Sequence, residues 1–153
     1  LANITAKDNI LCIGGGPCPH TAIILHNLTG AKVTVIDNNK KCTSKSKELI
    51  KKMGLSKYIK VCCNNGDKIN YVGYSIIHMA MQLSCKDKIL KRILSFSDYG
   101  AKVLVRMPKQ SIKSLYCCVD EQDCTQCTCV LHNSLTNVHH TALYIKERVS
   151  EKV

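Results

Sequence analysis

The chain has 153 residues, of which 45 % are hydrophobic, a length and composition that fit one globular domain with a buried core. No apolar run approaches the ~20 residues of a membrane helix, and no basic region followed by an apolar core opens the chain, so we expect a cytoplasmic protein without membrane contact. The net charge is +11. We nevertheless expect no nucleic-acid partner, because the basic residues are mostly scattered lysines without neighbouring aromatic side chains.

The stretch Asn9 to Leu28 reads NILCIGGGPCPHTAIILHNL, which predicts a strand, a tight turn and a helix. Gly14, Gly15 and Gly16 tolerate positive φ and let a ligand approach the backbone closely. Pro17 has no N–H and a preset φ, which suits a loop that enters a helix. This pattern predicts a nucleotide site at the turn.

The helix is expected from Thr21, with Ile24 and Leu28 spaced for one buried face. A β-branched run, Lys32 to Ile36, predicts the second strand. Asp37 closes that strand about 20 residues after the glycines, where dinucleotide folds place an acid on the ribose hydroxyls. The alternative is a solvated acid at a strand end.

A third unit follows with the same alternation. Lys41 to Met53 predicts an amphipathic helix that Gly54 ends, and Tyr58 to Cys63 predicts a strand. Asn64 to Lys68 is a polar turn at the carboxyl end of that strand, where α/β folds bind ligands. Asp67 in this turn is a candidate for the adenine or the ribose, with a plain turn residue as the alternative.

Two further strands are expected at Ser75 to Ala80 and Lys102 to Arg106, separated by a helix over Asp87 to Phe96. His78 within a strand is more typical of a packed residue than of a catalyst. Arg106, at the carboxyl end of its strand, is a candidate clamp for a carboxylate.

The last third predicts a short helical segment over 111–116 and then two strands, Val130 to His132 and His139 to Ile145, joined by a turn. The alternation predicts an α/β fold: a mostly parallel sheet with right-handed crossovers, helices on both faces and an antiparallel hairpin at its edge. S-adenosylmethionine-dependent transferase domains of the class I methyltransferase type end in this way.

Cysteine is abundant, and the odd number of 11 argues against a secreted disulfide framework. We interpret most of the thiols as small core residues in a reducing compartment, including Cys12 and either Cys62 or Cys63.

A cysteine cluster in the last third raises the alternative of a zinc or iron–sulfur site, for which Cys117, Cys118 or His132 would supply the further ligand beside Cys124, Cys127 and Cys129. We expect no metal, because the spacing is a weak motif. The cluster consists of Cys117, Cys118, Cys124, Cys127 and Cys129.

Two segments resemble the nicotianamine synthase family. GGGPCPHT is similar to the family's glycine-rich signature, and LYCCVDEQDCTQCTCVLHNSLTNVHHTALYIKER is similar to its C-terminal pattern. The resemblance implies one S-adenosylmethionine-binding Rossmann-like domain over residues 1–153. It also implies transfer of an aminobutyryl group, rather than a methyl group, to a small-molecule amine or amino-acid acceptor. An ordinary methyltransferase and a non-catalytic cofactor-binding domain are the alternatives.

The same resemblance implies roles for individual residues. Arg106 and Tyr116 are expected to face the carboxylate and the amine of the substrate, as catalytic residues. The expected cofactor-binding residues are Gly14, Gly15, Gly16, Pro17, Thr21, Asp37, Asn38, Asp67, Ala80 and Met81. Relatives carry a helical region before this domain, so we expect either a domain of a longer protein, a homodimer, or a reduced relative that binds cofactor without the same chemistry.

Overall fold

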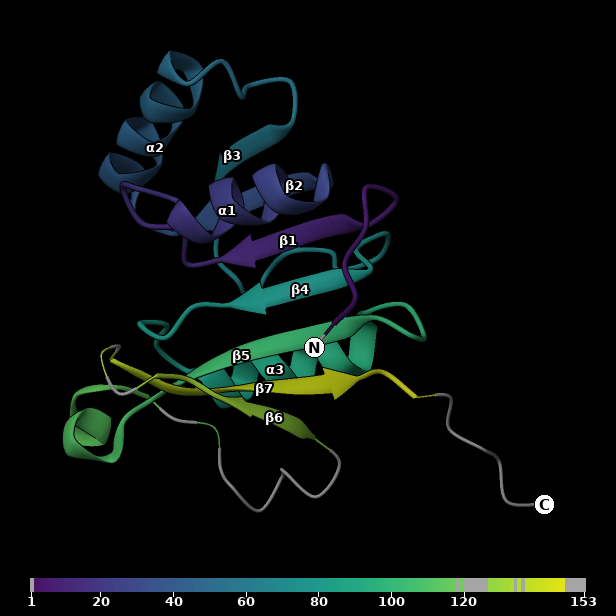
Figure 1. Ribbon diagram of the computed structural model, residues 1–153, viewed down its shortest axis with the longest axis vertical. Coiled ribbons are helices and arrows are strands. Elements are labelled where there is room, and N and C mark those ends of the chain that lie inside the picture. Colours follow the sequence, from purple (N-terminus) through teal and green to yellow (C-terminus); the bar gives the residue numbers. More distant parts are fainter. Residues whose placement is uncertain (1, 118, 120–126, 134, 136, 148–153) are drawn as a thin grey trace.

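The computed structural model describes residues 2–117, 119, 127–133, 135 and 137–147, which form a seven-stranded sheet flanked by helices (Figure 1). The strand order is β3-β2-β1-β4-β5-β7-β6. The first five strands of this order run parallel, and β7 runs antiparallel to both β5 and β6. The predicted α/β fold with an antiparallel last strand is therefore confirmed.

The observed elements agree with the predicted ones to within two residues at nearly every end, which is the usual uncertainty of helix and strand boundaries. They are β1 (Asn9–Ile13), α1 (His20–Thr29), β2 (Lys32–Asp37), α2 (Lys40–Lys52), β3 (Ile59–Cys63), β4 (Ile76–Met79), α3 (Lys86–Phe96), β5 (Lys102–Pro108), the 3-10 helix η1 (Gln110–Leu115), β6 (Thr128–Leu131) and β7 (Val138–Ile145).

The central strands are buried on both faces, as expected for a parallel sheet between helices. Alternate residues of β1 belong to two different clusters: Ile10 packs on the side of α1 and α2, and Leu11 packs on the side of α3. Figure 1 shows the same arrangement, with α1 and α2 in front of the sheet and α3 behind it. The prediction of helices on both faces is confirmed.

The buried face of α1 differs from the predicted one. Ile24 and Leu28 are 53 % and 79 % exposed, whereas Ala22 and Ile23 are buried against the sheet. Ile24 and Leu28 are four residues apart and share a face, but the orientation of the helix on β1 and β2 turns that face outward. The spacing of Ile24 and Leu28 showed that they share a face of the helix, but not whether that face meets the sheet or the solvent.

The cysteines also differ from the prediction. Of the nine described, Cys12 is buried, three are half-buried and five are exposed, and all nine are free. Most thiols are therefore not core residues, because they lie in loops, on helices or at strand ends rather than inside the central strands. Cys118 and Cys124 lie outside the described residues.

The described helices include none that is long and apolar enough to cross a membrane. Buried apolar residues of these helices, such as Ile23, Ile50 and Ile93, pack against the sheet instead.

Candidate functional site

A first hollow of about 290 Å³ opens where β1, β2 and β4 end and the loop after β3 begins. This is the edge at which open α/β sheets bind ligands. Six of the predicted cofactor-binding residues line it: Gly14, Gly16, Pro17, Asp37, Asn38 and Ala80.

The glycine turn is held against β2 by its own backbone. The N–H groups of Gly14 and Gly15 both donate to the carbonyl of Ile36, at 2.8 and 3.2 Å. Gly14 has φ +83°, which favours glycine, and a Cβ on Gly15 would lie 2.1 Å from Cγ1 of Val35. The sequence therefore needs small residues here for the turn and for close packing on β2.

Asp37 lies at the edge of the first hollow and connects three segments. Its Oδ2 accepts a hydrogen bond from the N–H of Gly16 at 2.8 Å, and its Oδ1 accepts one from the N–H of Asn39 at 2.9 Å. Asn39 in turn caps α2. An ionised carboxylate has about four acceptor positions, so two remain for hydroxyl groups of a ligand.

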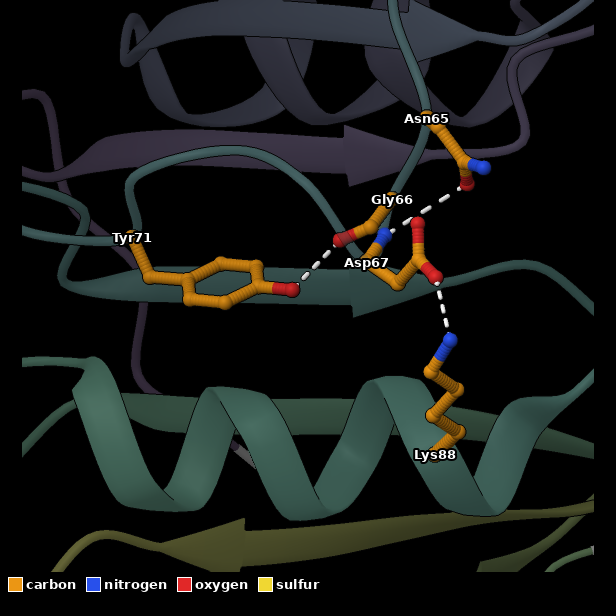
Figure 2. Close-up of polar contacts among 5 residues, drawn as sticks. All are labelled: Asn65, Gly66, Asp67, Tyr71 and Lys88. Atoms are coloured by element: carbon orange, nitrogen blue, oxygen red, sulfur yellow. Dashed lines mark hydrogen bonds and ion pairs between the residues drawn. The ribbon is translucent and has the colours of Figure 1, made fainter.

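The loop after β3 is held by two contacts, which meet at the adjacent residues Gly66 and Asp67 (Figure 2). The hydroxyl of Tyr71 donates to the carbonyl of Gly66, and Lys88 of α3 forms an ion pair with Oδ2 of Asp67 at 2.8 Å. Asn65 and Gly66 line the first hollow, and a Cβ on Gly66 would lie 2.7 Å from Ile13. The loop thus supplies part of the wall through its backbone.

Asp67 does not itself line the hollow. The hydrogen bond from Lys88 lowers the pKa of its carboxyl group, so the group stays ionised. Its second oxygen, Oδ1, is buried and has no hydrogen-bond partner among the described residues. A buried acceptor of this kind fits an N–H donor such as an adenine amino group, and the role of Asp67 stays a prediction.

A second hollow of about 320 Å³ lies on the other side of Gly14 and Ala80, which line both hollows. The amino end of α1 and the carboxyl ends of β4 and β5 form its walls. Gly15, Thr21, Met81 and Arg106 of the predicted set line this second hollow.

The ends of β4 and β5 are tied together by a buried lysine. Lys86 is fully buried, and its Nζ donates to the carbonyl of Met81 at 2.5 Å and to that of Arg106 at 3.2 Å. These contacts fix the backbone on which Met81 and Arg106 lie beside the second hollow. Because these hydrogen bonds are buried and involve a charged donor, they hold the two strand ends in fixed positions.

Tyr116 is placed differently from the other predicted residues. It follows η1, is half-buried and lines neither hollow. Its predicted contact with substrate stays a prediction.

The cysteine cluster brings two thiols together, with Cys127 Sγ 3.7 Å from Cys129 Sγ. Within the described part of the chain, no group of three or more histidine, cysteine or acidic side chains is arranged to hold a metal ion. Cys118 and Cys124 of this cluster lie outside that part.

Sequence reasoning missed several lining residues. His78 was interpreted as a packed residue, yet it lines the second hollow, and Gln82 lines both. The polar run after β3 contributes Asn64 and Asn65. Gln82, Asn64 and Asn65 each follow the end of a strand, and this position could have identified them. His78 lies inside β4 and offers no such signal.

The strand order, the glycine turn after β1 and the acid at the end of β2 define a Rossmann-like domain of the methyltransferase type. The chain matches the family model described as nicotianamine synthase protein over residues 2–143. It belongs to the nicotianamine synthase family.

Solved structures share this fold at low sequence identity. A complex of MtNAS with MTA and tNA has a TM-score of 0.81 and 20 % identity, over 94 % of this chain and 55 % of that one. A mutant of MtNAS in complex with S-adenosylmethionine has a TM-score of 0.79 and 21 % identity, over 96 % and 58 %. The chain therefore spans little more than half the length of these structures.

An RNA methyltransferase from Salinibacter ruber in complex with S-adenosyl-L-homocysteine has a TM-score of 0.77 at 12 % identity, over 99 % of this chain and 87 % of that one. At these identities the likeness concerns the fold. A search of curated proteins found no match.

Proposed function

We propose that this chain binds S-adenosylmethionine as a substrate and is the Rossmann-like part of a transferase that moves its aminobutyryl group to an amine. Family membership over residues 2–143 is the observation that carries this proposal. The site geometry supports it, because two adjoining hollows meet at the glycine turn and offer room for a nucleoside and for the reacting groups.

In this proposal the first hollow takes the nucleoside. Asp37 and Asn38 line this hollow and hold the ribose hydroxyls, and Asp67, which follows the lining residue Gly66, lies near the adenine. Gly14, Gly15, Gly16 and Pro17 form the turn against the methionine part. The fixed positions of Asp37 and of the loop after β3 mean that little ordering is needed when the ligand binds.

The second hollow takes the acceptor and the reacting carbon. The sulfonium of S-adenosylmethionine makes each attached carbon electrophilic, so the position of the amine selects the carbon that is transferred. Thr21, Ala80 and Met81 line the space between the turn and Arg106, whose guanidinium binds a carboxylate of the acceptor. Tyr116 lines neither hollow, so its contact with the acceptor rests on the family resemblance alone.

The transfer forms an N–C bond to the aminobutyryl carbon and breaks the C–S bond, whose electron pair stays on sulfur. The products are the alkylated amine and methylthioadenosine, with one proton released from nitrogen to water. The guanidinium of Arg106 beside this hollow disfavours a charged ammonium group and so favours the uncharged, nucleophilic amine.

Methyl transfer is the second candidate, and the fold shared with the Salinibacter ruber methyltransferase favours it. A cofactor-binding domain without catalysis is the third. The products separate the three: methylthioadenosine indicates aminobutyryl transfer, S-adenosylhomocysteine indicates methyl transfer, and neither appears without catalysis.

Calorimetric titration with S-adenosylmethionine tests the binding step. We expect micromolar affinity that Asp37→Ala weakens by about 1–3 kcal/mol, the cost of a lost hydrogen bond to a charged group. Glu48→Ala, which removes an exposed acid of α2 outside both hollows, is the control and leaves the affinity unchanged. Equal effects of the two substitutions, or no binding by the unmodified chain, would contradict the proposal.

A further inference from the structure

His78 lies in the wall between the second hollow and a third hollow of about 450 Å³ on the face of the sheet beside α1. Three residues, Thr21, His78 and Arg106, line both spaces. The third hollow extends from there over β5 and β7 toward β6, where Val130 and His132 line it. The imidazole therefore lies at the boundary between the two hollows. A short ligand would end there, and a longer one would extend into the third hollow.

The imidazole of His78 is buried without a hydrogen-bond partner for Nε2 among the described residues, and the residue is only 5 % exposed. Burial, followed by the positive charge of Arg106, lowers the pKa of His78 to about 3, so the ring is uncharged at neutral pH. Buried polar groups are normally paired, and leaving one unpaired costs free energy of folding. A ligand that supplies the missing partner recovers this free energy on binding.

Arg106 is the charged neighbour of this ring. The register of β4 and β5 pairs His78 with Leu104, so His78 and Arg106 lie on the same face of the sheet, two residues apart on adjacent strands. The ion pairs of the described residues are Lys52 with Glu48 and Lys88 with Asp67, neither of which involves Arg106. A half-buried guanidinium beside a neutral imidazole matches a molecule that carries both a carboxylate and an amine.

We propose that His78 is a further substrate-binding residue, whose imidazole hydrogen-bonds the amine of an acceptor whose carboxylate is held by Arg106. This inference rests on the proposed transferase function and adds to it the residue that contacts the amine of the acceptor. The ring positions the amine and does not take up its proton, because its proton affinity is too low. The nearby guanidinium disfavours a charged ammonium group and so favours the nucleophilic form.

The test uses small probes on the complete chain at about pH 9, where more of each amine is uncharged. The probes are ω-amino acids of two to four carbons and the matching carboxylates without the amine, titrated calorimetrically. For the best-fitting length, we expect the amino acid to bind about tenfold more tightly than its matching carboxylate. His78→Phe abolishes this preference and leaves carboxylate binding within twofold, whereas Arg106→Gln weakens both probes.

Conservative variants separate hydrogen bonding from packing. His78→Asn and His78→Gln place an amide near the two ring-nitrogen positions, so at least one of them restores most of the preference. His132→Phe, in the wall of the third hollow only, is the matched control and retains it. Circular dichroism and urea unfolding establish that each variant is folded.

Three results would overturn the inference: no amine preference in the unmodified chain, a preference that survives His78→Phe, or an equal loss for both probes. Titration of the same chain with S-adenosylmethionine gives an independent result on the proposed function. An amine preference without S-adenosylmethionine binding refutes only the transferase proposal. S-adenosylmethionine binding without the amine preference refutes only the role of His78.

Discussion

At Gly15, a single added methyl group would overlap a neighbouring side chain of the core. Its neighbour across β2 is Val35, which is fully buried, and a Cβ on Gly15 would lie 2.1 Å from Cγ1 of that side chain. Neither the turn nor the strand has space to absorb the overlap without movement. The glycine therefore sets how closely the turn approaches the sheet.

We expect Gly15→Ala to lower the free energy of unfolding by about 1–3 kcal/mol, the usual cost of overpacking a core. Urea denaturation measures it. The double variant Gly15→Ala with Val35→Ala removes Cγ1 and relieves the overlap, so it is less destabilised than the sum of the two single variants. Strict additivity would show that the turn simply moves away from β2.

Because the buried ring of His78 is neutral, we expect the free energy of unfolding to depend on pH. Its pKa is about 3 in the fold and 6.5 in a model peptide, so below pH 6.5 the unfolded chain binds a proton that the folded chain does not. Stability contributed by this residue is fully present above pH 6.5 and falls as the pH decreases toward 3. The slope approaches about 1.4 kcal/mol per pH unit.

Urea denaturation of the unmodified chain and of His78→Gln between these pH values measures the effect. The variant lacks the titrating ring, so its stability falls less steeply with decreasing pH. His20→Gln, which removes an exposed histidine, keeps the steep dependence of the unmodified chain. Parallel curves for His78→Gln and the unmodified chain would contradict a neutral, buried His78.

At the scale of elements, the loop after β3 is structured although it contains no helix. Tyr71 is fully buried, burial raises the pKa of its phenol, and its hydroxyl closes the loop onto Gly66. Lys88 connects the same loop to α3 through Asp67 (Figure 2). The wall of the first hollow thus depends on one contact within the loop and one from α3.

We expect Tyr71→Phe to cost about 0.5–1.5 kcal/mol of stability, because it removes a buried hydrogen bond and keeps the ring. S-adenosylmethionine affinity should fall two- to tenfold as the loop loosens, measured by calorimetry. Tyr99→Phe, at an exposed tyrosine, changes neither quantity. Unchanged affinity in Tyr71→Phe would mean that the loop keeps its position without this contact.

The order and type of elements followed from the sequence, because alternating strands and amphipathic helices leave few arrangements. The glycine turn and Asp37 were recognisable from spacing. The role of His78 was not, since a histidine inside a strand has no local signature, and Lys86 gave no signal of burial. The orientation of α1 could not be predicted either, because packing against the sheet decides which of its two apolar faces is buried.

For the whole molecule, charge is the dominant unbalanced property. The net charge is +11, and α2 alone carries six lysines, of which Lys52 pairs with Glu48. Like charges that remain unscreened destabilise a compact fold. Screening by salt should therefore stabilise this chain rather than weaken it.

Raising the salt concentration from about 10 to about 100 mM shortens the Debye length from about 30 to about 10 Å. We expect the thermal midpoint to rise by about 2–4 °C, equivalent to about 1 kcal/mol for a chain of this size. Scanning calorimetry measures it. Replacing Lys41, Lys45, Lys47 and Lys51 by glutamine removes four positive charges, so the thermal midpoint should depend less on salt concentration. An unchanged salt dependence would mean that the repulsion arises outside α2.

Lys86 offers a natural reporter for the motions of this fold. Acylating reagents modify an amine only when solvent reaches it, and this amine is enclosed between the start of α3 and the ends of β4 and β5. We expect labelling at position 86, followed by mass spectrometry, to be far slower than at the exposed lysines of α2. Its rate then measures how often the junction opens, and a ligand seated beside Met81 and Arg106 slows it further.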